Sequence, residues 1–173
     1  MRGDSSLKYY LYDLIEAQNM DNTSEEQLIQ IDKQLEQNIL AYQQIFHSLK
    51  ERLTPEVYEH FNGWGFHDCR LIKIEFEHKS LLNLNVNLII SNNTEKKKDE
   101  KFLVLSFKNV SNFHFQHLNS QNEASVFHRE IDDWLYQEFL PIDNTTLSFE
   151  VIFSSGANIS LHFPNNNVTL EKK

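Results

Sequence analysis

The sequence predicts an α+β protein, in which N-terminal helices, one of them long, pack on a mostly antiparallel meandering sheet or partial barrel. Two patterns support this prediction. Through residue 62, apolar residues recur every three or four positions, as in amphipathic helices. From residue 63 they alternate with polar residues in successive short runs, and the short connections between these runs require antiparallel pairing. We therefore expect a helical subdomain at residues 1–62 and an antiparallel β subdomain at residues 63–173, packed as one compact unit.

Two helices are predicted before residue 54. Asp4 or Ser5 can cap a short first helix that ends near residues 19–22. The segment Ser24-Glu25-Glu26-Gln27 has the pattern of a capping box, in which a serine and a residue three positions later bond to each other's backbone. Apolar residues then follow at steps of three or four through Leu53. This spacing predicts a helix of about 30 residues, which would be roughly 45 Å long.

The apolar stripe of the long helix allows two arrangements. From Leu35 onward its steps are heptad-like, so the helix could pair with a second copy as a coiled coil. The alternative is packing within the chain, against the sheet and the first helix. We expect this second arrangement, and therefore a monomer, because a sheet of this size needs an apolar cover.

A short third helix is predicted at residues 55–61, because Thr54 can cap it and a proline follows at the first helical position. It runs into a glycine corner at residues 63–65, whose two glycines permit the turn into a strand. We expect Trp64 and Phe66 to plug this corner against the sheet, since both side chains are large and apolar.

Seven strands are predicted by alternation. In the first, Ile72, Ile74 and Phe76 alternate with charged residues, so one face of this strand should lie in the core. A polar run at residues 92–100 predicts a mobile loop, and a second capping-box pattern at residues 120–123 predicts a short helix. The first of these strands follows Asp68 and ends at the break around residues 79–80, and the others are residues 81–91, 101–110, 112–118, 147–153, 159–163 and 168–170.

His67 and Asp68 raise the question of a metal site. Adjacent His and Asp ligate metals in phosphohydrolases of the HD type, but there the pair lies on helices and further His and Asp ligands join it. Here the pair opens a strand, and no second ligand cluster with recognisable spacing follows. We expect Asp68 to accept backbone N–H bonds at the turn, and His67 to pack or bond at the corner.

Three motifs resemble those of an uncharacterised bacterial protein family. They are FHDCRLIKIEFEHKSLLN at Phe66–Asn83, FKNV at Phe107–Val110 and WLYQE at Trp134–Glu138. That family has a helical N-terminal part and a β-rich C-terminal part with an HD strand opener, an F-x-N-V strand and a WLY-x-E strand. More loosely, the motifs resemble the Immunity protein 50 family of bacterial polymorphic toxin systems.

The resemblance covers residue 61 to the C-terminus. It implies a fold but no catalytic residues, since none is established in either family. It implies a strand at residues 134–140, where the local pattern alone would favour a continuing helix. The looser resemblance implies an immunity protein, which neutralises a toxin by binding it. We expect structural roles for the six residues that carry the family motifs, namely Phe66, His67, Asp68, Trp134, Tyr136 and Glu138.

The excess of acidic residues indicates which kinds of molecule the chain could bind. The sequence has 25 acidic and 16 basic residues, a formal charge of −9. This charge repels nucleic-acid phosphates and anionic membranes, so we expect neither as a partner, and it favours a basic protein. The sequence shows no signal-peptide pattern, no run of membrane-spanning length and a single cysteine, which together predict a cytoplasmic location. The candidate contacts for a basic partner are Glu75, Glu77, Asp132 and Asp133.

Four kinds of catalytic motif are missing from the sequence: a glycine-rich phosphate loop, a Ser/His/Asp elbow, a Cys-x-x-Cys pair and a convergent carboxylate pair. We therefore expect no catalytic residue, no metal and no cofactor. The leading hypothesis is a non-enzymatic cytoplasmic binding protein, most specifically an immunity protein for a basic toxin. The alternatives are a metal-dependent hydrolase that uses His67 and Asp68, and an interaction subunit that dimerises through the long helix.

Overall fold

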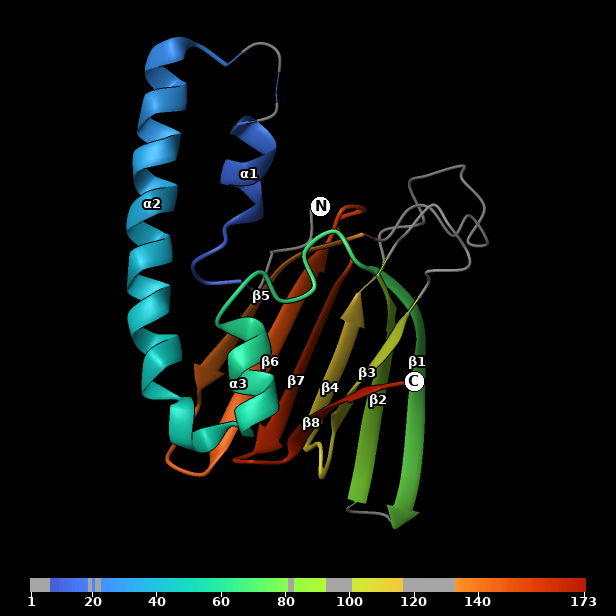
Figure 1. The fold of residues 1–173 in the computed structure, drawn as a ribbon. Coiled ribbons are helices and arrows are strands. Elements are labelled where there is room, and N and C mark those ends of the chain that lie inside the picture. Colours follow the sequence, from blue (N-terminus) through green and yellow to red (C-terminus); the bar gives the residue numbers. More distant parts are fainter. Residues whose placement is uncertain (1–6, 19, 21–22, 81–82, 93–100, 117–132) are drawn as a thin grey trace.

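The computed structural model describes residues 7–18, 20, 23–80, 83–92, 101–116 and 133–173. It has the predicted α+β architecture, with helices along one side of two antiparallel sheets (Figure 1). The predicted loop at residues 92–100, except Asn92, and the predicted helix after residue 120 lie outside the described residues.

Three α-helices and one 3₁₀ turn form the helical part: α1 is Tyr12–Gln18, α2 is Glu25–Ser48, the 3₁₀ turn is Lys50–Arg52 and α3 is Pro55–Phe61. The capping box at the start of α2 is confirmed, because Ser24 Oγ accepts from the Gln27 N–H and Gln27 Oε1 accepts from the Ser24 N–H. The helix has 24 residues, fewer than predicted, because the chain tightens into the 3₁₀ turn after Leu49. The predicted bounds of α3 are correct.

The first helix starts later than the sequence predicts. Its proposed caps, Asp4 and Ser5, lie outside the described residues, and residues 7–11 are not helical. The backbone N–H groups of Lys8, Tyr9 and Tyr10 instead donate to the carboxylate of Glu138. The backbone N–H groups of this segment therefore bind the side chain of a residue distant in sequence, and α1 has only seven residues.

All eight predicted strands form, and every pairing between them is antiparallel. The first sheet has the order β1-β2-β3-β8, and the second has the order β4-β7-β6-β5. The segment that could have continued as a helix is strand β5. The bounds are β1 Arg70–Ser80, β2 Asn83–Ser91, β3 Phe102–Phe107, β4 Asn112–Gln116, β5 Trp134–Pro141, β6 Thr146–Phe153, β7 Asn158–Pro164 and β8 Val168–Lys172.

The core lies between the two sheets and is rich in aromatic rings. Phe107 of β3 contacts Phe149 of β6 and Phe163 of β7, with ring centroids 4.9 and 5.0 Å apart. The helices close the side of this core, because Phe61 of α3 lies 5.0 Å from Phe139 of β5. All five of these side chains are buried, so the helical and β parts share one core.

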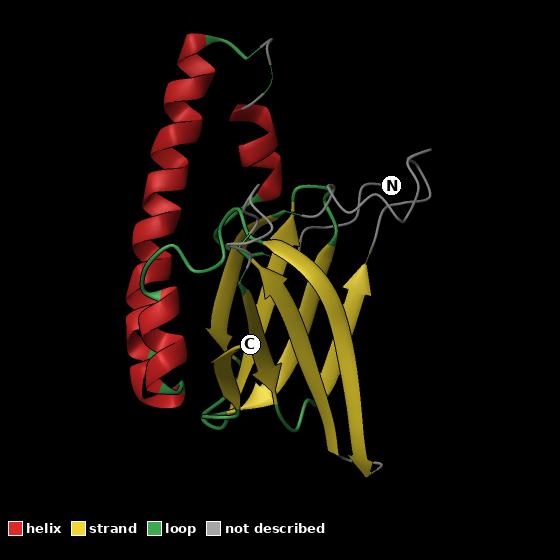
Figure 2. Ribbon diagram, turned by 45° about the vertical axis from the view of Figure 1, so that its right-hand side comes forward, coloured by secondary structure: helices red, strands yellow, loops and turns green. Residues whose placement is uncertain are grey.

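The expected core face of β1 is only partly buried. Ile72 is 45% exposed and Phe76 is 54% exposed, while Ile74 is half-buried. An irregularity in the pairing with β2 falls between Leu71 and Lys73, so Ile72 sits at a bulge. The end of the β1–β2 hairpin extends beyond the neighbouring strands (Figures 1 and 2). Phe76 lies where β3 still pairs with β2, and its ring meets that of Phe113 of β4 edge to face at 4.9 Å.

Helix α2 packs on the sheets through its second half only. Tyr42 and Phe46, in the second half of the helix, are buried against β5. The first half of α2 lies beside α1 and extends beyond the end of the strands (Figure 1). Ile29 and Leu40, on the other side of the helix, are 68% and 54% exposed. None of the helices in the described part of the chain is long and apolar enough to cross a membrane.

Candidate functional site

The residues that carry the family motifs meet around β5. The ring of Phe66 lies 5.1 Å from that of Trp134, and the ring of His67 lies 5.5 Å from that of Tyr136. The backbone N–H of Asp68 donates to the Trp134 carbonyl at 3.0 Å. The loop between α3 and β1, residues 62–69, is thus fastened along the start of β5. We call this loop the corner.

His67 binds the outer edge of β5. Its Nδ1 lies 2.8 Å from the Leu135 carbonyl oxygen. Because a carbonyl can only accept, Nδ1 carries the proton. Helix α2 covers the next part of the same edge, since the Tyr42 hydroxyl accepts from the Phe139 N–H at 3.0 Å. These contacts satisfy backbone groups that an edge strand would otherwise expose.

Asp68 has an unusual backbone conformation and an exposed side chain. Its φ is 62°, in the left-handed region, which Asp and Asn tolerate better than other non-glycine residues. The carboxylate is 83% exposed and lies 3.9 Å from His67 Nε2. Asp68 therefore fastens the corner through its backbone N–H, while its carboxylate faces solvent.

We expect Asp68→Ala to lower the free energy of unfolding by about 1–2 kcal/mol, because alanine must adopt the left-handed conformation without a polar side chain to favour it. Asp68→Asn should remain within about 0.5 kcal/mol of the wild type, since asparagine tolerates this conformation. Urea denaturation of the three proteins checks this. An asparagine variant as unstable as the alanine variant would show that the carboxylate charge, rather than the backbone conformation, stabilises the corner.

The predicted role of Trp64 is wrong. Phe66 is fully buried as expected, but Trp64 is 83% exposed. Gly65 between them has a φ of 59°, a turn of the backbone that sends the two neighbouring side chains in different directions. The indole ring lies on the ring of His67, with centroids 5.8 Å apart and planes at 21°.

An aromatic stack continues inward from Trp64 and His67. The ring of Tyr136 stacks on that of His67, and the ring of Tyr10 stacks in turn on that of Tyr136, with centroids 4.8 Å apart and an interplanar angle of 10°. Tyr10 in turn meets the buried Tyr42 edge to face at 5.5 Å. The exposed indole is thus the outer end of a row of rings that reaches the core.

Glu138 lies beneath this stack and is completely buried. It accepts hydrogen bonds from the backbone N–H groups of Lys8 at 2.9 Å, Tyr9 at 2.6 Å and Tyr10 at 2.8 Å. Burial raises the pKa of Glu138, and the three backbone hydrogen bonds oppose this rise only in part. Burial, followed by the nearby Glu138 charge, raises the pKa of Tyr10 to about 12.

His67 and Asp68 form a pair, and a metal site would need further ligands. Among the described residues, no group of three or more His, Cys, Asp or Glu side chains is close enough to hold a metal ion. The hydrolase alternative therefore has no ligand set in the part of the chain that the structure describes.

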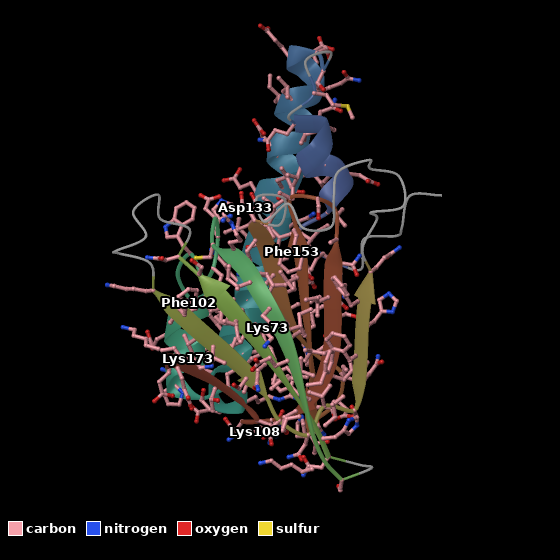
Figure 3. The ribbon with its side chains drawn as sticks, turned by 90° about the vertical axis from the view of Figure 1, so that its right-hand side faces the viewer. Lys73, Phe102, Lys108, Asp133, Phe153 and Lys173 are labelled. Atoms are coloured by element: carbon pink, nitrogen blue, oxygen red, sulfur yellow. The ribbon has the colours of Figure 1, made fainter. Side chains whose placement is uncertain are left out.

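Basic or polar side chains accompany the two predicted acidic contacts on β1. Glu75 pairs with Lys73 at 2.7 Å, and this hydrogen bond holds the pKa of Glu75 below its usual value. Glu77 accepts from Asn85 at 2.9 Å and lies 3.8 Å from Lys79. Asp133 lies just before β5, and its backbone forms an isolated antiparallel bridge with Arg70 of β1 (Figure 3). Asp132 lies outside the described residues.

The acidity of the chain is concentrated in the helical part. Residues 1–62 contain eleven acidic and five basic residues, a formal charge of −6, whereas residues 63–173 contain fourteen and eleven, a charge of −3. On α2, five exposed residues recur at steps of three and four and therefore share one side of the helix. We call this side the outer stripe: Glu26, Ile29, Lys33, Glu36 and Leu40.

A groove of about 570 Å³ separates α1 from the first half of α2. The described part of its lining combines apolar side chains with glutamines and one threonine. The groove can hold apolar groups, and its described lining residues supply no acid, base or thiol for catalysis. The lining residues are Leu14, Ala17, Thr23, Gln27, Gln30, Ile31 and Gln34.

Comparison with known proteins adds no relative from which a function could be transferred: no protein-family model matches the sequence, and no curated protein matches it significantly.

Proposed function

We propose that this chain is a non-enzymatic cytoplasmic protein that binds a basic protein partner, most specifically an immunity protein that neutralises a basic toxin. The observation that carries the proposal is the uneven acidity of the chain. Its helical part has a formal charge of −6, and helix α2 turns one complete side to solvent. Such a field attracts a basic partner and speeds their encounter.

The outer stripe of α2 supports protein binding in particular. Ile29 and Leu40 are 68% and 54% exposed, and the exposed Glu26 and Glu36 flank them along the helix. Apolar side chains with charged neighbours suit an interface that has a small apolar centre and a polar rim. The opposite side of α2 is occupied by its contacts with α1 and β5, so the outer stripe can bind a partner without any change in the fold.

A charge reversal on the outer stripe tests this function. We expect Glu26→Lys/Glu36→Lys to slow association with the protein encoded by the neighbouring gene by about tenfold or more, because the change reverses the field that steers the partner. Surface plasmon resonance gives the association rate, and co-expression with growth measurement gives protection. The matched control is Glu59→Lys/Glu171→Lys, which changes the net charge equally at exposed positions on α3 and β8.

Equal slowing in both double variants would show that net charge alone acts, and that the outer stripe is not the contact. If the neighbouring protein neither binds nor is neutralised, the immunity proposal fails. Metal-dependent hydrolysis of a phosphoester that is lost in His67→Ala would then favour the hydrolase alternative.

The apolar stripe whose steps are heptad-like from Leu35 onward packs within the chain at Tyr42 and Phe46, so the outer stripe is the side of α2 that a second copy would contact. We expect a monomer at micromolar concentration, because Lys33, Glu26 and Glu36 leave only two apolar residues in the stripe, too few for a stable coiled-coil seam. Sedimentation velocity measures this. A dimer that dissociates in Leu40→Glu, with unchanged circular dichroism, would support the interaction-subunit alternative.

A further inference from the structure

The corner presents two exposed side chains on a firmly held backbone. Trp64 is 83% exposed, more than any other large apolar residue in the described part of the chain. The carboxylate-bearing side chain of Asp68, four residues later, is also 83% exposed. A tryptophan at this degree of exposure adds little to the core, and tryptophan is among the residue types that most often anchor a protein interface.

The backbone between the two side chains is fixed from several directions. Phe66 is buried against Trp134, His67 binds the Leu135 carbonyl, and the Asp68 N–H binds the Trp134 carbonyl. Gly65 is so closely packed that a Cβ atom there would lie 3.0 Å from Phe61 Cδ1. A partner that binds the corner would therefore lose little free energy to ordering the loop.

The imidazole of His67 links the two exposed groups. It lies 5.8 Å from the indole of Trp64, nearly parallel to it, and its Nε2 lies 3.9 Å from Asp68 Oδ1. One face of the indole thus rests on the aromatic stack, while most of the indole faces solvent. Flat cations stack on aromatic faces and pair with carboxylates, and the corner offers one group of each kind.

We propose that the corner is the recognition point for an arginine side chain of the partner protein, whose guanidinium stacks on Trp64 and pairs with Asp68. This inference rests on the proposed function and names one contact through which the basic partner is recognised. Arginine fits better than lysine, because its guanidinium is planar, stacks on aromatic rings and forms forked hydrogen bonds with carboxylates. Tryptophan and arginine are also the residue types that most often dominate binding energy at protein interfaces.

The two tryptophans of the chain provide an internal comparison. In a titration with hexa-arginine at low salt, followed by ¹⁵N-resolved NMR, we expect the indole N–H signal of Trp64 to shift. That of Trp134 should stay in place, because Trp134 is fully buried and its N–H donates to Gln137 Oε1 at 2.6 Å. Hexa-lysine should bind several-fold more weakly than hexa-arginine. Equal affinity for the two peptides would contradict stacking of a guanidinium on the indole of Trp64.

Three variants separate the site from general charge attraction. Trp64→Ala and Asp68→Asn should each weaken hexa-arginine binding about fivefold, whereas Glu171→Gln should weaken it less than about twofold. Glu171→Gln is the matched control for Asp68→Asn, since both remove one exposed negative charge and Glu171 lies on β8, outside the corner. The inference is wrong if Asp68→Asn and Glu171→Gln have equal effects, or if Trp64→Ala has none.

The same variants distinguish failure of this inference from failure of the proposed function. A partner protein that binds the wild type, Trp64→Ala and Asp68→Asn with one affinity would refute the arginine site and leave the binding function intact. Specific hexa-arginine binding at the corner, without any binding of the neighbouring protein, would support the site and refute the immunity proposal.

Discussion

Trp134→Ala will lower the free energy of unfolding by about 3–5 kcal/mol. The indole of Trp134 is fully buried and contacts Phe66, Phe149 and Phe153 at centroid distances of 5.1, 6.0 and 5.6 Å. Its removal leaves a cavity where the corner meets β5 and β6, and it leaves Gln137 Oε1 without its donor. Urea denaturation followed by circular dichroism measures the loss.

Trp64→Ala is the matched control for this variant, because it removes the same side chain from an exposed position in the same region. Its stability should remain within about 0.5 kcal/mol of the wild type. If Trp64→Ala destabilises the chain as much as Trp134→Ala does, the indole of Trp64 supports the fold, and its exposure is not a sign of partner binding.

Glu138→Ala will lower the free energy of unfolding by about 1–3 kcal/mol and will release the segment of residues 7–10. Its carboxylate is the acceptor for three consecutive backbone N–H groups, and alanine offers none. Hydrogen exchange at Lys8, Tyr9 and Tyr10 should speed up in the variant. Glu138→Gln keeps one acceptor oxygen, so its free energy of unfolding should fall less than that of Glu138→Ala. Unchanged exchange in Glu138→Ala would mean that other contacts hold the segment.

The raised pKa of Glu138 also fixes the sign of a pH effect. When folding raises a pKa, the folded state binds the proton more tightly, so the group's contribution to stability is full below the unfolded-state pKa. This contribution is lost as the pH rises through the folded-state pKa. The stability difference between wild type and Glu138→Gln should therefore shift in favour of the wild type as the pH falls from 7 to about 4. A shift in the opposite direction would contradict the raised pKa.

The sequence predicts most of the fold because the relevant signals are local. The capping box at Ser24 and the proline at position 55 mark helix starts, and alternation marks each strand. Strand β5 is the exception among them. Its local pattern suits a helix, and tertiary contacts, including the bond from the Phe139 N–H to the Tyr42 hydroxyl, hold it as a strand.

The candidate site was harder to predict because it depends on contacts distant in sequence. Glu138 lies 128–130 residues from the three N–H groups that it binds, and nothing near residue 8 signals that the helix will start late. The exposure of Trp64 follows from the positive φ of Gly65, whereas hydrophobicity alone predicts burial. The exposed outer stripe of α2 depends on which neighbours the helix has, and periodicity cannot supply this information.

We propose that an acidic surface of this chain recognises a basic protein without catalysing a reaction. The most direct measurement is an isothermal titration of this chain with the protein encoded by the neighbouring gene, at low and at high salt. We predict a one-to-one complex whose affinity falls steeply as salt rises, with the basic protein losing its activity in the complex. No heat of binding at low salt, or an affinity that is indifferent to salt and to Glu26→Lys/Glu36→Lys, would contradict the account.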